Sequence, residues 1–159
     1  MVCEHILGKL KDIDTKGRTV EYVDIEWFEA FKRIHSKVTS QGRPIGIRMD
    51  DSILKTGLVT GDIIYEDDEL IISVNTPPCE VTYIQVDFEH AHMVAKVCYE
   101  IGNRHAPLFW GESNLTFITP YDEPIYRMLE QMHGVQVEKK VVKLDFDHKI
   151  SAQVSSHHH

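Results

Sequence analysis

Residues 81–109 read VTYIQVDFEHAHMVAKVCYEIGNRHAPLF, and this stretch decides the fold of the second half of the chain. The strand-like segment VTYIQV is followed by a predicted helix over residues 88–103, with Asp87 placed to cap its start and Gly-Asn-Arg at its end. A further apolar, strand-like segment begins directly after His105. A histidine therefore lies at a junction where an apolar residue would suit a folded core better, and this position raises the main question about function.

The elements predicted after this stretch complete a ferredoxin-like domain. Residues 106–111 and 114–119 are predicted to form two strands joined by a short polar turn. A second helix is predicted over residues 122–134, with a proline tolerated in its first turn, and a last strand over residues 135–144. The element order is βαββαβ, in which two helices cover one face of a four-stranded antiparallel sheet.

The first half of the chain is predicted to be all-β, as a small sandwich or barrel. Short segments rich in β-branched residues alternate with turn material such as TKGR, SQGR and TGD. The acidic run at residues 66–69, EDDE, is interpreted as a hairpin turn with a solvated tip rather than a catalytic pair.

Two prolines in the segment NTPPCE, residues 75–80, interrupt the strand pattern and favour a domain boundary. The predicted class is α+β. We expect an N-terminal all-β domain over residues 1–76, a ferredoxin-like βαββαβ domain over residues 77–145, and a flexible C-terminal tail over residues 146–159.

The composition argues against several classes of protein. The chain of 159 residues is 42% hydrophobic and 26% charged, as in soluble globular proteins, and has no apolar run near the roughly 20 residues of a membrane span. With no visible signal peptide, a cytoplasmic location is expected. The 25 acidic residues against 17 basic ones do not suit a nucleic-acid partner. The odd count of three cysteines, without a CxxC pair, favours reduced thiols.

The chain contains ten histidines, and imidazole is a common ligand for borderline transition metals. His148 and the terminal run His157, His158 and His159 fall on the predicted tail, from which they could reach a metal held elsewhere. The terminal run fits either a native tail or the remnant of an expression tag.

His105 extends the apolar stripe of the first helix, since Val94, Cys98, Ile101 and His105 follow a spacing of i, i+4, i+7 and i+11. Its ring is therefore expected near the boundary of a packed face. A histidine at this position can instead have a purely structural role, in which it interacts with the last helical carbonyls and the negative end of the helix dipole. The spacing alone leaves both interpretations open.

The remaining histidines are predicted to have ordinary surface roles. His90 and His92 are two residues apart and cannot face each other on a regular helix, although they could at a frayed first turn, and both are interpreted as mostly solvated. His35 alternates with Ile34 on a strand and is expected to point to solvent. His133 lies near the end of the second helix and suits the dipole as a cation.

Enzyme signatures are lacking, so the chain is predicted not to be an enzyme. The sequence has no GxSxG, P-loop, HExxH or glycine-rich dinucleotide turn. Cys98, in the middle of a helix on an apolar stripe, is interpreted as a small buried hydrophobic residue and not as a nucleophile.

The segment YEIGNRHAPLF, residues 99–109, strongly resembles the signature of the UreE family of urease accessory proteins, which carry nickel. The likeness covers nearly the whole chain. VDIEWFEAFKRI (23–34), GRPIGIRM (42–49) and TGDIIYEDDELIISV (60–74) are similar to the N-terminal β domain of that family, and a histidine-bearing tail is also typical of it.

The resemblance implies a peptide-binding-like β domain, a ferredoxin-like metal-binding domain and a homodimer joined through the latter. It also implies that His105 from both subunits binds one shared Ni²⁺ at the dimer axis, a site that could also bind Zn²⁺. His148 and the terminal run would be candidate further ligands. Some family members carry an auxiliary pair of histidines after the signature, but LTFITPYDEP, residues 115–124, contains none.

The function that the resemblance implies is nickel delivery for assembly of the urease active site, through an accessory GTPase and the apo-urease complex. One alternative is a general nickel or zinc protein for storage or buffering. Another is a small hydrolase that activates water on a bound metal, which would need a fixed base beside an open coordination site. The signature itself contains no aspartate or glutamate to act as that base.

Overall fold

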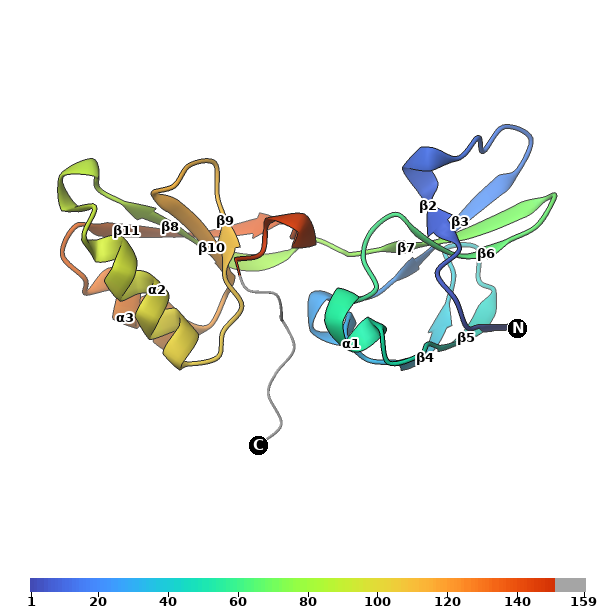
Figure 1. Ribbon diagram of the computed structural model, residues 1–159, viewed down its shortest axis with the longest axis horizontal. Coiled ribbons are helices and arrows are strands. Elements are labelled where there is room, and N and C mark those ends of the chain that lie inside the picture. Colours follow the sequence, from blue (N-terminus) through green and yellow to red (C-terminus); the bar gives the residue numbers. More distant parts are fainter. Residues whose placement is uncertain (151–159) are drawn as a thin grey trace. The chain divides into compact units, whose positions relative to one another are not determined.

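The computed structural model describes residues 1–150, and the chain divides into two compact units, Met1–Pro77 and Pro78–His159 (Figure 1). The division falls between two consecutive prolines, neither of which has a backbone N–H to donate to a sheet. Each unit is described by itself below.

The first unit contains a four-stranded and a three-stranded sheet. The β3–β7 and β1–β5 pairs are parallel, and the other pairs are antiparallel. The four-stranded sheet has the order β2 (Gly8–Lys9), β6 (Asp62–Glu66), β7 (Leu70–Asn75), β3 (Thr19–Asp24), and the three-stranded sheet the order β1 (Val2–Cys3), β5 (Pro44–Arg48), β4 (Ile34–Val38). Short helices lie between the strands: η1 (Leu10–Asp12), η2 (Trp27–Glu29) and α1 (Ile53–Thr56).

Side chains from both sheets form the core of this unit. Val23 of β3, Ile47 of β5 and Ile72 of β7 are buried together. The turn between β6 and β7 confirms the hairpin predicted at the acidic run. The N–H of Asp67 donates to the carbonyl of Leu70 at 2.9 Å, and its carboxylate accepts from the Leu70 N–H at 2.7 Å.

His35 is buried, which corrects the prediction that it points to solvent. Its side chain is 7% exposed, whereas the neighbouring Ile34 is 71% exposed. The ring Nε2 lies 2.9 Å from the carbonyl oxygen of Lys32, so the neutral imidazole donates a hydrogen bond to the backbone. Burial lowers the pKa of His35 below its usual value, which keeps the ring neutral near pH 7.

The second unit has the ferredoxin-like plan. Its sheet has the order β11-β8-β10-β9 with every pair antiparallel, and both helices lie on one face of it (Figure 1). The elements along the chain are β8 (Cys79–Val86), α2 (Met93–Asn103), β9 (Phe109–Trp110), β10 (Thr116–Pro120), α3 (Glu123–Glu130) and β11 (Val135–Val142). The α+β class is thereby confirmed. None of the helices within residues 1–150 is long and apolar enough to cross a membrane.

Both helices bury an apolar face against the sheet. Ile101 of α2 and Leu129 of α3 pack with Ile84 and Phe117, and all four side chains are fully buried. Helix α3 begins at a capping residue, since the Asp122 carboxylate accepts a hydrogen bond from an N–H in the first turn. It ends at Glu130, several residues before the predicted end.

The first helix begins later than predicted. Phe88–His90 form a 3₁₀ helix, η3, and α2 starts only at Met93. The Asp87 side chain does not cap η3, and it accepts a hydrogen bond of 3.4 Å from the Gln136 side chain on β11. The break between η3 and α2 changes the directions of His90 and His92, which an unbroken helix would have held apart.

The C-terminal segment is folded as far as the structure describes it, which corrects the predicted start of a flexible tail at residue 146. Phe146–His148 form a 3₁₀ helix, η4, and Phe146 is buried against Phe109 with ring centroids 5.9 Å apart. Lys149 pairs with Phe109 in an antiparallel bridge, and the Ile150 N–H donates to the carbonyl of Leu108 at 2.8 Å. The segment lacks a repeating pattern, but its apolar side chains still bury surface beside β9.

Candidate metal centre

Helix α2 ends in a Schellman motif. The N–H of His105 donates to the carbonyl of Gly102 at 3.0 Å, and the N–H of Ala106 donates to the carbonyl of Ile101 at 3.3 Å. These two bonds satisfy carbonyls that the end of a helix would otherwise leave without a donor. Ala106 packs against the same apolar cluster as Ile101, which is the hydrophobic contact that accompanies the motif.

The motif places His105 at the position that normally favours glycine. His105 has a φ of 58° and is the only non-glycine residue with positive φ within residues 1–150. The left-handed conformation costs an L-residue roughly 1–2 kcal/mol, although histidine, asparagine and aspartate adopt it more often than others. His105 is also exposed. The helix end therefore holds an imidazole at the surface in a backbone conformation that glycine would adopt more readily.

Two small residues and a tyrosine form an exposed stripe on α2 before His105. Ala95, Tyr99 and Gly102 are exposed and recur at a helical spacing of i, i+4 and i+7. Tyr99 is 67% exposed, which is unusual for an aromatic residue. Apart from its chain neighbours and the backbone of its own helix, no atom lies within 4 Å of the position where a Cβ on Gly102 would stand, so this part of the helix is open.

Arg104, the residue before His105, forms an ion pair within its own helix. Its guanidinium donates to the Glu100 side chain at 2.6 Å and to the Glu100 backbone carbonyl at 3.0 Å. The positive charge next to the histidine is thus balanced within the same helix.

The other predicted metal ligands fall into two groups. His148 lies on η4, is exposed, and has its Nε2 3.8 Å from the carboxylate of Asp145. His157, His158 and His159 lie outside the described residues. Across residues 1–150, no three His, Cys, Asp or Glu side chains are already arranged to hold an ion. Within one chain, therefore, the described residues bring no complete ligand set to His105.

Two of the three thiols are poor candidates for metal ligands. Burial raises the pKa of the Cys3 and Cys98 thiols, so both stay protonated near pH 7, whereas metals bind the thiolate. The prediction that Cys98 acts as a small hydrophobic residue agrees with its packing against the apolar core of the second unit.

Sequence reasoning missed a group of three histidines in the second unit. The ring centroids of His90 and His133 are 4.5 Å apart, and those of His90 and His92 are 6.1 Å apart. His133 comes from the turn before β11, and the other two come from the segment before α2. No local pattern could have found this group, because it depends on the pairing of β8 with β11.

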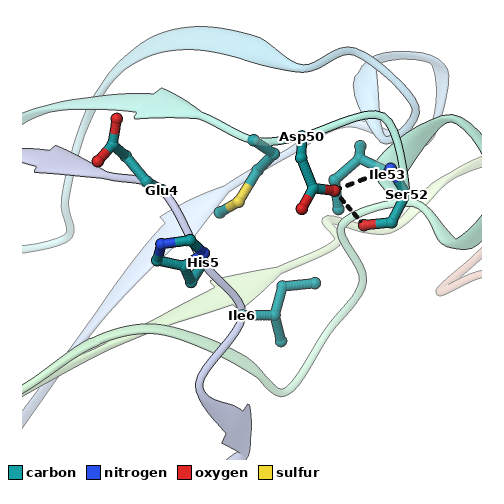
Figure 2. A pocket seen from close by; sticks show the side chains of 7 residues that line it. Glu4, His5, Ile6, Asp50, Ser52 and Ile53 are labelled. Carbon is teal, nitrogen blue, oxygen red and sulfur yellow. Dashed lines mark hydrogen bonds between the residues drawn. The ribbon is translucent and has the colours of Figure 1, made fainter.

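The first unit has a pocket of 190 Å³ (Figure 2). Its polar lining includes two carboxylates. The Glu4 carboxylate accepts a hydrogen bond from Arg48 at 3.1 Å, and that of Asp50 accepts one from the Ser52 N–H at 2.9 Å. The bond from Arg48 lowers the pKa of Glu4, and the bonds from the Ser52 hydroxyl and then the Ser52 N–H lower that of Asp50, so both groups stay ionised near pH 7. The lining residues are Glu4, His5, Ile6, Met49, Asp50, Ser52 and Ile53.

The fold and the helix-end histidine together define a two-domain α+β protein that presents a candidate metal ligand on its surface. The model of the UreE urease accessory protein N-terminal domain matches residues 3–76, and that of the C-terminal domain matches residues 80–159. The chain belongs to the UreE family of urease accessory proteins, which is a family of accessory proteins and not of enzymes.

Similar proteins come from several Helicobacter species and carry the name urease accessory protein UreE. That of Helicobacter pylori strain Shi470 is 42% identical over 154 residues, which cover 97% of this chain and 88% of the relative. That of Helicobacter acinonychis strain Sheeba has the same identity and coverage. That of Helicobacter bizzozeronii is 34% identical over 151 residues, which cover 95% of this chain and 83% of the relative. A urease accessory role, with other components of urease maturation as partners, follows from this membership.

Proposed function

We propose that this chain is a nickel metallochaperone that acts as a homodimer, holds one Ni²⁺ between the His105 side chains of its two subunits, and delivers the ion for assembly of the urease active site. The observation that carries the proposal is the histidine at the glycine-favouring position that ends α2. A residue that only ended the helix would be glycine at lower conformational cost, so the imidazole is the reason for a histidine here.

The exposed face of α2 supports a symmetric dimer. A two-fold axis brings the same surface of both subunits together, and small residues such as Ala95 and Gly102 let two helices approach closely. Tyr99 would lose its large exposed surface in such an interface. Because His105 comes three residues after Gly102 at the end of α2, an axis that passes the end of this face brings the two imidazoles near one ion.

Two imidazoles fill only part of a nickel coordination shell. Ni²⁺ takes about four to six donors, and imidazole nitrogen suits it. His148 and the terminal run His157–His159 are further candidate donors, as is water. A partly filled shell suits a carrier, because an incoming ligand can bind the ion before the carrier releases it. Zn²⁺ shares the preference for imidazole and would bind at the same site.

The partners in delivery are the second part of the proposal. An accessory GTPase and the apo-urease complex would receive the ion in the cytoplasm. The first unit would contact the partner protein through its pocket, where the ionised carboxylate of Asp50 suits a lysine or arginine side chain.

Calorimetric titration with nickel tests the metal site. The proteins to compare are the full chain, His105→Ala, and a chain ended after Ile150, which keeps the bond from Ile150 to Leu108. We expect His105→Ala to lose the strongest site, about one ion per dimer, because symmetry removes two ligands at once. The shortened chain should keep that site with lower total capacity or modestly weaker affinity.

His5→Ala serves as the matched control, because it removes an exposed imidazole from the other unit. The mass of the dimer is measured in parallel for each protein. If His105→Ala keeps the strongest site, or if the chain is monomeric with and without nickel, the proposed site is wrong.

A further inference from the structure

The three histidines His90, His92 and His133 meet at one corner of the second unit, which we call the histidine corner. The corner forms where the chain leaves β8 and where it enters β11. Val86 and Val135 are paired across these strands, and the Asp87 N–H donates to the carbonyl of Gly134 at 2.8 Å. Backbone pairing therefore fixes the two segments that carry the histidines against each other.

Gly134 allows His90 to pack directly on the turn. Its φ is +77°, and a Cβ at this position would lie 2.5 Å from the Cβ of His90 and 2.6 Å from its Cγ. Any larger residue at position 134 would displace the ring. The structure thus places the His90 ring against a backbone surface shaped to accept it, next to His133.

The two nitrogens of His90 have different environments. Nδ1 is buried and has no hydrogen-bond partner within residues 1–150, and the nearest carboxylate oxygen, Oδ2 of Asp87, is 3.9 Å away. The side chain as a whole is 29% exposed, so its exposure belongs to the other atoms. In metal sites a ligating histidine commonly directs one nitrogen to the ion and the other, as N–H, to a carboxylate. Asp87 stands where that carboxylate would be.

The ring spacings fit a shared ion. With a metal–nitrogen bond of about 2.0–2.1 Å and a ring centre about 1.1 Å beyond the nitrogen, two imidazoles at 90–110° around one ion have centroids about 4.5–5.3 Å apart. The His90 and His133 rings are packed edge to face, with centroids 4.5 Å apart and planes at 90°, and the His90–His92 centroids are 6.1 Å apart. These distances are close to that range, but the ring nitrogens meet at one ion only after the rings turn. His92 and His133 are exposed, so their rings can rotate.

We propose that the histidine corner is a second metal site, which binds a borderline divalent cation through His90 and His133, with His92 as a third ligand and Asp87 as the carboxylate that orients His90. The exposed rings of His92 and His133 complete the ligand set when they turn so that their nitrogens and Nε2 of His90 bind the same ion. The site lies within one chain, and it does not depend on His105 or on dimer formation.

The ion class follows from the donors. Imidazole nitrogens suit Zn²⁺, Ni²⁺ and Cu²⁺, whereas Mg²⁺ and Ca²⁺ prefer oxygen ligands. Asp87 and the exposed Glu89 add negative charge at the same corner, which favours a cation. In a chain that handles metal, such a site would hold an additional ion away from the dimer axis.

Zinc titration followed by nuclear magnetic resonance tests the site, with the full chain carrying His105→Ala as the starting protein. The imidazole nitrogen signals of His90 and His133 and the amide signal of Gly134 are followed as Zn²⁺ is added. We expect these signals to shift together as one ion binds per chain. His133→Gln should weaken the response of His90 about tenfold or more, because a ligand is lost.

His5→Gln provides the matched control, since it removes an exposed imidazole without touching the corner. It should leave the His90 response unchanged. The proposal is wrong if zinc fails to shift the His90 signals, if His133→Gln leaves their response intact, or if His5→Gln weakens it equally. Loss of the site proposed at His105 would not alter any of these results.

Discussion

Replacing His105 with glycine should separate the backbone cost of this position from its function. His105 has a φ of 58° at the end of α2, and the two hydrogen bonds of the helix end do not involve its side chain. His105→Ala and His105→Gly remove the same imidazole and every contact it makes. The two variants differ only in the Cβ atom, which alanine must place in the left-handed region.

The expected difference between the two variants can be estimated. The left-handed conformation costs an L-residue roughly 1–2 kcal/mol, while glycine loses about 0.4–1 kcal/mol more chain entropy on folding. The glycine variant should therefore be about 0.5–1 kcal/mol more stable than the alanine variant. For a unit of this size, such a difference raises the melting temperature by a few degrees.

The assay is thermal unfolding of both variants and the unsubstituted chain, first without metal and then with nickel. At nickel concentrations about 100 times the dissociation constant, linkage stabilises a protein that binds only in the folded state by about 2.7 kcal/mol. We expect this increase for the unsubstituted chain and its absence at the strongest site in both variants. An alanine variant as stable as the glycine variant would refute the argument from φ, and a nickel response equal to that of the unsubstituted chain would refute the role of His105.

Three further substitutions test other parts of the structure. The buried His35 has a lowered pKa, so the unfolded state takes up a proton first as pH falls below about 6.5, and the free energy of unfolding should fall there. His35→Gln should flatten this decline in a denaturant series at several pH values. Gly134→Ala should destabilise the second unit by more than about 1 kcal/mol, since its Cβ would lie 2.5 Å from that of His90 and its φ is +77°; unchanged stability in chemical unfolding would contradict this. Phe146→Ala should lower the stability of the second unit by about 3 kcal/mol, because the buried ring packs on Phe109, and a loss below about 0.5 kcal/mol would mean that the segment does not belong to the folded unit.

The plan of the second unit could be predicted because its sequence periods change clearly from strand to helix. Val97 and Ile101 bury one face of α2, and Ile125 and Leu129 bury one face of α3, as the helical spacing indicates. The break before Met93 could not be predicted, since a 3₁₀ turn continues a helical pattern in the sequence.

The orientation of β4 shows where hydrophobicity misleads. Ile34 and Val38 are exposed, while His35 on the other face of the strand is buried. Alternation correctly predicts a strand, but it cannot tell which face meets the core when the buried histidine satisfies its own hydrogen bond to a nearby carbonyl. Tertiary contacts outside the local window decide the orientation.

The two candidate metal sites also differ in how much of each could be predicted from local sequence. The position of His105 at a helix end could be predicted from local sequence, although its φ of 58° could not. The histidine corner depends on Val86 pairing with Val135, and therefore on contacts between residues nearly fifty positions apart. Local periodicity carries no information at that distance.

The bond from Ile150 to Leu108 fixes the starting point of whatever follows it in the chain. Leu108 comes three residues after His105, so the attachment point is within about 11 Å of His105 along the backbone. For a donor within reach of the ion proposed at His105, a starting point this near corresponds to an effective concentration in the millimolar range. Because closure entropy changes only slowly with loop length, this origin would matter more to the proposed site than the exact position of a histidine beyond it.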